Sequence, residues 1–148
     1  MKKAIIIVSA IILAAVIVLM IQHITFKHTP ESVLKVHFKM SLKGFDYTVD
    51  TFQEQWCPNG DGEAFVIYKF NELTQDNIDY LKGFGLKPLP ISGEGVEQRV
   101  SNKIHKEYYS IDTGYYFYGP LSSHDPGDYK ILILDIEKKI MIFYYQYI

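Results

Sequence analysis

An unbroken apolar run near the amino terminus constrains this chain more than any other feature. From Ala4 to Ile21 there are 18 residues, and Ser9 is the only polar one among them. As an α-helix this run is about 27 Å long, close to the hydrocarbon thickness of a bilayer, and a helix satisfies its own backbone groups in lipid. We therefore expect residues 1–24 to form a transmembrane signal-anchor helix whose partner is the lipid bilayer. Positions along this membrane-spanning helix are Ala4, Ile7, Ile11, Ala15, Val18 and Ile21.

The residues on either side of the run predict its orientation in the membrane and whether it is cleaved. Lys2 and Lys3 precede it, which favours a cytoplasmic amino terminus and an extracytoplasmic carboxyl-terminal domain. A cleaved signal peptide has an apolar region of about 7–15 residues followed by small residues. Here the run is longer, and bulky residues from Gln22 to Phe26 follow it. We expect an uncleaved single-pass anchor; cleavage would instead make the chain a secreted protein.

The rest of the chain reads as a juxtamembrane link over residues 25–30 and one exported domain over residues 31–148. With Lys2 and Lys3 set aside, that domain is mildly acidic and has one arginine, Arg99. Nucleic-acid binding depends on clustered Lys and Arg, so we expect no nucleic-acid partner, and we also expect no nucleotide and no cofactor. Cys57 is the sole cysteine, which rules out a disulfide within the chain.

Alternating and continuous apolar patterns predict the elements of this domain. A proline and a glutamate at residues 30 and 31 suit the first turn of a helix predicted over about residues 31–41 and closed by Gly44. Thr74 can cap a second helix that Gly83 and Gly85 end. Residues 92–106 allow a short helix. The strands are predicted over residues 45–50, 64–70, 108–111, 115–118, 129–134 and 140–147, the last two joined as an antiparallel hairpin. The fold class is therefore α+β, an antiparallel sheet of four to six strands with one or two helices on a face.

The search for catalytic or metal-binding chemistry yields only weak candidates. The segment from Cys57 to Glu63 lacks the oxygen ligands of a calcium loop and reads as a hairpin turn. A small envelope hydrolase or metal-dependent enzyme would use His105, His124 and Asp125, but neighbours in sequence rarely meet the geometry of a triad. We expect no catalytic residues, no metal site and no enzymatic activity.

Tyrosine-rich strands are the most distinctive remaining feature. Neighbouring residues of a strand point to opposite faces, so these runs place aromatic rings on both sides of the sheet. A second helix or loop can cover the outer side, or that side can be an exposed recognition surface, as tyrosine favours. The candidate protein-binding residues are Tyr115, Tyr116, Tyr118, Tyr144 and Tyr145. We expect a non-enzymatic, membrane-anchored protein whose exported domain binds another envelope protein, as an adaptor or as an immunity-type inhibitor.

Overall fold

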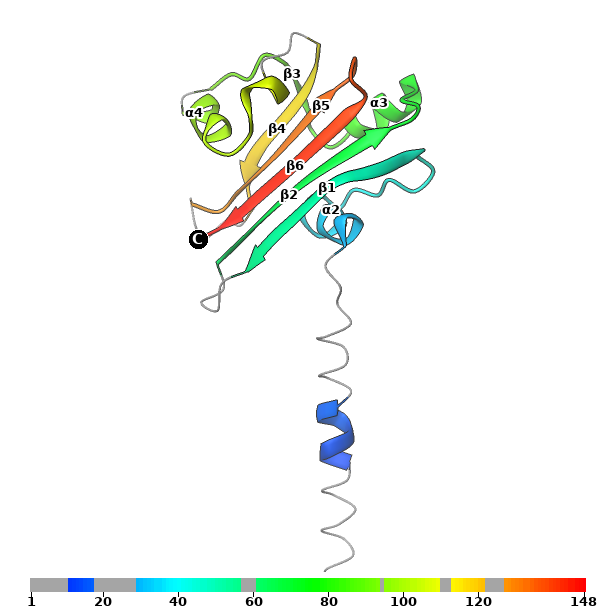
Figure 1. Ribbon diagram of the computed structural model, residues 1–148, viewed down its shortest axis with the longest axis vertical. Coiled ribbons are helices and arrows are strands. Elements are labelled where there is room, and N and C mark those ends of the chain that lie inside the picture. Colours follow the sequence, from blue (N-terminus) through cyan, green and yellow to red (C-terminus); the bar gives the residue numbers. More distant parts are fainter. Residues whose placement is uncertain (1–10, 18–28, 57–60, 94, 110–112, 122–126) are drawn as a thin grey trace, which may run out of the picture.

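The described part of the chain forms a six-stranded sheet with helices on both of its faces. The computed structural model describes residues 11–17, 29–56, 61–93, 95–109, 113–121 and 127–148. All strand pairs are antiparallel, and the order across the sheet is β1-β2-β6-β5-β4-β3 (Figure 1). The strands are β1 (Tyr47–Trp56), β2 (Gly62–Phe70), β3 (Lys87–Pro88), β4 (Gly114–Pro120), β5 (Tyr129–Asp135) and β6 (Ile140–Tyr147). The α+β class is thereby confirmed, with six strands at the upper end of the expected range.

Capping residues define the two longer helices of the domain. Helix α2 (Pro30–Phe38) begins with a capping box in which Thr29 and Ser32 bond each other's backbone amides, and it ends where Lys39 takes a left-handed conformation with φ of 59°. Helix α3 (Gln75–Lys82) begins with the same arrangement between Thr74 and Asn77. Each cap satisfies amide groups that the first helical turn leaves without partners.

Apolar side chains on opposite faces of the sheet form two separate cores. In β5, Leu132 and Leu134 face α2 and α3, while Ile131 and Ile133 face the other side. Helix α4 (Val96–Ser101) and the segment after it cover that second side through Val100 and Ile104, which are 0% and 1% exposed. Figure 1 shows α4 in front of the sheet and α2 and α3 behind it. The sheet is therefore the middle of three layers.

Three expectations about the elements of the domain were wrong. The described residues of the domain include three α-helices, α2, α3 and α4, together with a 3-10 helix at Lys106–Tyr108, where one or two helices on one face were expected. That 3-10 helix also occupies the start of the strand predicted at residues 108–111, of which 110 and 111 lie outside the described residues. Helix α2 ends at Phe38, well before Gly44, because Lys39 already adopts the left-handed geometry that stops a helix.

The apolar run is described at residues 11–17 only, and these residues are helical. Their side chains are exposed on every side of the helix, Val16 at 41% and Ile11 at 63%. Among the described residues, no helix has both the length and the apolar character needed to cross a membrane. Of the positions predicted to span the membrane, Ile11 and Ala15 lie in this helix, whereas Ala4, Ile7, Val18 and Ile21 lie outside the described residues. The transmembrane anchor stays a prediction.

Candidate functional site

A row of polar residues crosses four strands at one end of the sheet, on the face that carries α4. The strand register places Gln55 of β1 beside Glu63 of β2, Glu63 beside Gln146 of β6, and Gln146 beside Tyr129 of β5. Paired residues of antiparallel strands point to the same face, so the four side chains form one continuous row. Lys103, which follows α4, reaches the row from above and contacts Glu63 with its Nζ 3.0 Å from Oε2.

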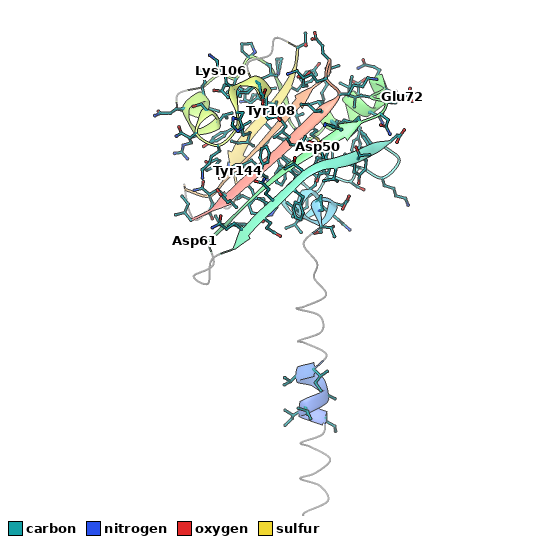
Figure 2. All side chains as sticks on the ribbon, viewed as in Figure 1. Asp50, Asp61, Glu72, Lys106, Tyr108 and Tyr144 are labelled. Atoms are coloured by element: carbon teal, nitrogen blue, oxygen red, sulfur yellow. The ribbon has the colours of Figure 1, made fainter. Side chains whose placement is uncertain are left out.

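Hydrogen bonds tie this row to the second core. The Tyr144 hydroxyl lies 2.7 Å from Oε2 of Glu63 and 3.0 Å from Oε1 of Gln146, and the Tyr129 hydroxyl lies 3.4 Å from the same Gln146 oxygen. Figure 2 labels Tyr144 on the sheet, with Asp61 below it at the lower end, just before β2. We call Tyr129, Gln146, Tyr144, Glu63 and Lys103 the Glu63 network. A cleft of about 310 Å³ adjoins it, lined by Gln55, Asp61, Gly62, Glu63, Lys103, Gln146, Tyr147 and Ile148.

The electrostatics of the network suit recognition better than acid–base catalysis. The hydrogen bond from Tyr144, followed by that from Lys103, lowers the pKa of Glu63. Burial, followed by the bond to Glu63, raises the pKa of Tyr144. A general base works best with a pKa near the working pH, whereas these shifts hold Glu63 ionised and Tyr144 protonated at neutral pH. The cleft therefore presents fixed hydrogen-bonding groups and a compensated charge.

Cations also lie against the aromatic rings of the network. Lys103 Nζ is 5.7 Å from the ring centre of Tyr144, and the Arg99 guanidinium is 5.7 Å from that of Tyr129. Both distances lie within the range of cation–π attraction. The end of α4 is thereby held to the sheet by charge as well as by the apolar contacts of Val100 and Ile104.

The five tyrosines predicted to bind a partner do not form one surface patch. Tyr115 and Tyr145 lie on the face that carries α2 and α3, while Tyr116, Tyr118 and Tyr144 lie on the face that carries α4. Three of them are almost fully buried, Tyr116 and Tyr144 at 3% exposed and Tyr145 at 1%, and the other two are half-buried. Of the two readings left open for the outer aromatic side, coverage by a helix is the one observed.

The two edge strands of the sheet, β3 and β1, differ in their length and in the residues that protect them from pairing with another strand. The β3 edge is two residues long and consists of Lys87 and Pro88, a lysine and a proline, both of which discourage pairing with another strand. The β1 edge is ten residues long. Its first half carries a register irregularity between Val49 and Thr51, and Asp50 forms an ion pair with Lys69 there. Such bulges and charges protect an edge strand from pairing with a strand of another chain.

The second half of β1, Thr51 to Trp56, contains neither a proline nor a basic residue. Gln53 and Gln55 are exposed on the α4 face, and the one charged residue, Glu54, accepts a 3.1 Å hydrogen bond from the Tyr145 hydroxyl on the other face. We call residues 51–56 the open edge. It adjoins the cleft directly, because Gln55 belongs to both, and a smaller hollow of about 180 Å³ also lies between Gln53, Gln55 and Glu63.

The residues of the alternative hydrolase are not brought together by the described structure. His105 is exposed just before the 3-10 helix, while His124 and Asp125 lie outside the described residues. In the part of the chain that the structure describes, no three His, Cys, Asp or Glu side chains are placed to hold a metal ion. Residues 57–60 of the calcium-like loop also lie outside it, and Gly62 already belongs to β2.

The fold and the site define this chain as a small α+β domain with helices on both faces of an antiparallel sheet. Compared with protein-family models, with curated proteins and with solved structures, the chain gives no match. Sequence reasoning missed both the Glu63 network and the open edge, although the absence of lysine and proline between Thr51 and Trp56 is visible in the sequence.

Proposed function

We propose that this chain is a non-enzymatic, single-pass membrane protein whose extracytoplasmic domain binds another envelope protein, in the manner of an adaptor or an immunity-type inhibitor. The partner supplies an extended segment that pairs with the open edge of β1. The observation that carries the proposal is the contrast between the two edges: β3 has a lysine and a proline, and residues 51–56 have neither. Strand addition gains affinity from main-chain hydrogen bonds and specificity from neighbouring side-chain pockets.

The cleft beside the open edge supplies such a pocket. A strand added next to β1 would place alternate side chains on the α4 face, beside Gln53 and Gln55. There the ionised Glu63 and the Lys103 ammonium group offer charged hydrogen-bonding groups to a polar side chain of the partner. Hydrogen bonds to charged groups are the stronger ones, so this pocket favours a polar partner residue.

Helical residues 11–17 support the membrane part of the proposal. Their apolar side chains are exposed all around the helix, as expected of a segment that lipid surrounds. To test the anchor, the full chain is expressed and its membranes are washed at alkaline pH; an integral protein stays in the pellet. Ile12→Arg with Val16→Arg should release it, since each arginine costs about 3 kcal/mol at the bilayer centre. Ile12→Leu with Val16→Leu is the matched control, and retention of the arginine variant would contradict the anchor.

To test the open edge, a photo-crosslinking residue is placed at Gln53, and a control crosslinker is placed at Glu97, which is exposed on α4. Adducts with another protein from Gln53 alone, lost when Gln55→Lys is added, support strand addition. Thr48→Lys is the matched control, because Thr48 is exposed on the protected half of β1. Adducts of equal yield from both crosslinkers, or an adduct with a second copy of this chain, would overturn a partner bound at this edge.

A further inference from the structure

The charge of the domain is distributed very unevenly along the chain. Residues 22–45 contain Lys27, Lys35, Lys39 and Lys43 against the single acidic residue Glu31. Residues 46–148 contain nine basic and sixteen acidic residues. The basic part is also the part that lies next to the apolar run. A domain of this kind has one end attracted to an anionic surface and a remainder repelled by it.

The structure places three of these lysines on one exposed surface around α2. Lys35 lies on the helix, Lys39 ends it, and Lys43 lies in the loop that follows, all of them exposed. The opposite side of α2 is held in the core by Val33 and Leu34, at 2% and 1% exposed. Packing of Val33 and Leu34 therefore fixes the orientation of α2, and the three lysines are exposed to solvent. We call Lys35, Lys39 and Lys43 the lysine patch.

Side chains around the lysine patch add to its suitability for a phosphate group. Lys35 and Lys43 line a hollow of about 450 Å³ together with the hydroxyl-bearing Ser32 and Ser41. The one carboxylate in its wall, Glu31, accepts a 3.0 Å hydrogen bond from Tyr47. Val36, 52% exposed, lies between Lys35 and Lys39 in the sequence and offers an apolar side chain beside the charges.

Positive charge also accumulates at the carboxyl end of α2. Lys130 of β5 donates a hydrogen bond from Nζ to the carbonyl oxygen of His37 and lies 4.8 Å from the ring centre of Phe38. Burial, followed by the charge of Lys39, lowers the pKa of Lys130. A nearby anion would relieve this crowding of like charges.

From these observations we infer that the lysine patch binds the anionic headgroups of the bilayer in which the chain is anchored, and so holds the domain in one orientation. The inference rests on the proposed anchor. Eight residues, 22–29, separate Ile21 from α2, and even fully extended they span at most about 28 Å. The patch therefore lies within reach of the headgroups, and Lys27 lies within the link itself. Basic clusters beside a transmembrane helix are best known on the cytoplasmic side, where they bind anionic lipids; the same attraction applies on the extracytoplasmic side wherever that leaflet contains anionic lipid.

The test uses the full chain in nanodiscs, either of phosphatidylcholine alone or with added phosphatidylglycerol, each containing a gadolinium-chelating lipid. Paramagnetic broadening of the backbone amides reports which residues lie at the headgroups. We expect residues 35–43 to broaden strongly in the anionic discs and weakly in the zwitterionic ones. Lys35→Gln, Lys39→Gln and Lys43→Gln together should remove the difference. The matched control replaces Lys82, Lys87 and Lys106 by Gln, which changes the net charge equally at sites remote from α2 in sequence.

The outcomes separate this inference from the proposal on which it rests. A chain that does not co-elute with the discs contradicts the anchor. Co-elution with equal broadening in both lipids, or an equal effect of the control variant, leaves the anchor standing and overturns the lysine patch. Inorganic phosphate is added to the zwitterionic discs as a further arm. If it shifts the resonances of Lys35 and Lys43 at millimolar concentration while the anionic discs leave broadening unchanged, the hollow binds free phosphate and the membrane contact is overturned.

Discussion

The Tyr144 hydroxyl donates a 2.7 Å hydrogen bond to the carboxylate of Glu63, which lies 81 residues earlier in the chain on the neighbouring strand. This bond joins a core residue, 3% exposed, to a carboxylate at the surface. It also links the second core to the cleft beside the open edge. A substitution of either residue should therefore alter both the stability of the second core and the charge of the cleft.

Tyr144→Phe should destabilise the domain by about 2 kcal/mol, because it removes a hydrogen bond to a charged acceptor while keeping the ring. It should also raise the pKa of Glu63, since that bond is the largest cause of the lowered value. Chemical denaturation and a carboxyl NMR titration measure the two effects. Tyr80→Phe is the comparison, because the Tyr80 hydroxyl donates to the neutral carbonyl of Ser41 on the surface. An equal loss in both variants would contradict a special contribution of Glu63.

Acid should weaken the fold through the carboxylates whose pKa values are lowered. The pKa of Glu63 is lowered by Tyr144 and then Lys103, and that of Asp50 is lowered chiefly by Lys69. The unfolded chain takes up these protons at the ordinary values, near about 4, and the folded chain takes them up only at lower pH. Stability should therefore be complete above that range and fall as the pH drops through the folded values. Glu63→Gln should flatten the acid limb of unfolding free energy against pH; an unchanged limb would argue against the contribution of Glu63.

Alkali should weaken the fold through buried tyrosines. Burial, followed by the hydrogen bond to Glu31, raises the pKa of Tyr47 to about 12. Burial is also the largest cause of the raised pKa of Tyr68 and of Tyr145. The unfolded chain loses these protons near about pH 10 and the folded chain only at higher pH, so stability is complete below pH 10 and falls above it. Tyr68→Phe should make that fall shallower in denaturation curves, and a stability independent of pH up to 12 would refute the prediction.

Two neighbouring residues of β5 test whether the sheet has two cores. Leu132 and Ile133 are both 0% exposed but belong to clusters on opposite faces. Replacing either by Ala should cost about 2–5 kcal/mol, because each change leaves a cavity in a packed interior. Val36→Ala, at a residue 52% exposed, should change the unfolding free energy by less than about 0.5 kcal/mol. If Ile133→Ala were as mild as Val36→Ala, the α4 layer would not form a true core.

Gly114 at the start of β4 should tolerate no side chain. Its φ is +146°, and an added Cβ would lie 2.2 Å from the carbonyl oxygen of Leu134 on the paired strand. Gly85 has a φ of +83°, but nothing lies within 4 Å of a Cβ there. Gly114→Ala should therefore cost well above the roughly 1 kcal/mol of backbone strain expected for Gly85→Ala. Thermal unfolding of the two variants measures the difference in stability. Equal losses of stability would mean that β4 shifts to accommodate the added Cβ of Gly114→Ala.

Local patterns account for the elements that could be predicted. The hairpin of β5 and β6 was predicted from two apolar runs joined by a short charged turn, and the structure confirms it. Helix α3 was predicted from Thr74 and the glycines that follow, and its capping box confirms that start. In these places propensity, capping and apolar periodicity all favour the same structure.

Contacts between distant parts of the chain account for what could not be predicted. Residues 92–106 were predicted to allow a short helix, but its bounds were not predicted. Helix α4 has six residues and no side-chain cap at Gly95, and packing of Val100 against the sheet stabilises it. The Glu63 network depends on the register between β2 and β6. A shift of one residue would turn Tyr144 to the opposite face, and no local pattern determines that register.

The position of β6 between β2 and β5 has a consequence for how the domain is made. Among the described residues, β6 is the strand that pairs with both β2 and β5, so until residues 140–147 have been synthesised no strand pairing joins the β1–β2 hairpin to the β3–β4–β5 group. Pairs so distant in sequence form slowly, because a long loop must close first. The nascent chain therefore exposes the inner edges of β2 and β5 throughout its elongation. Chaperones, or rapid passage through a translocation channel, would be needed to keep those edges apart until the final strand closes the sheet.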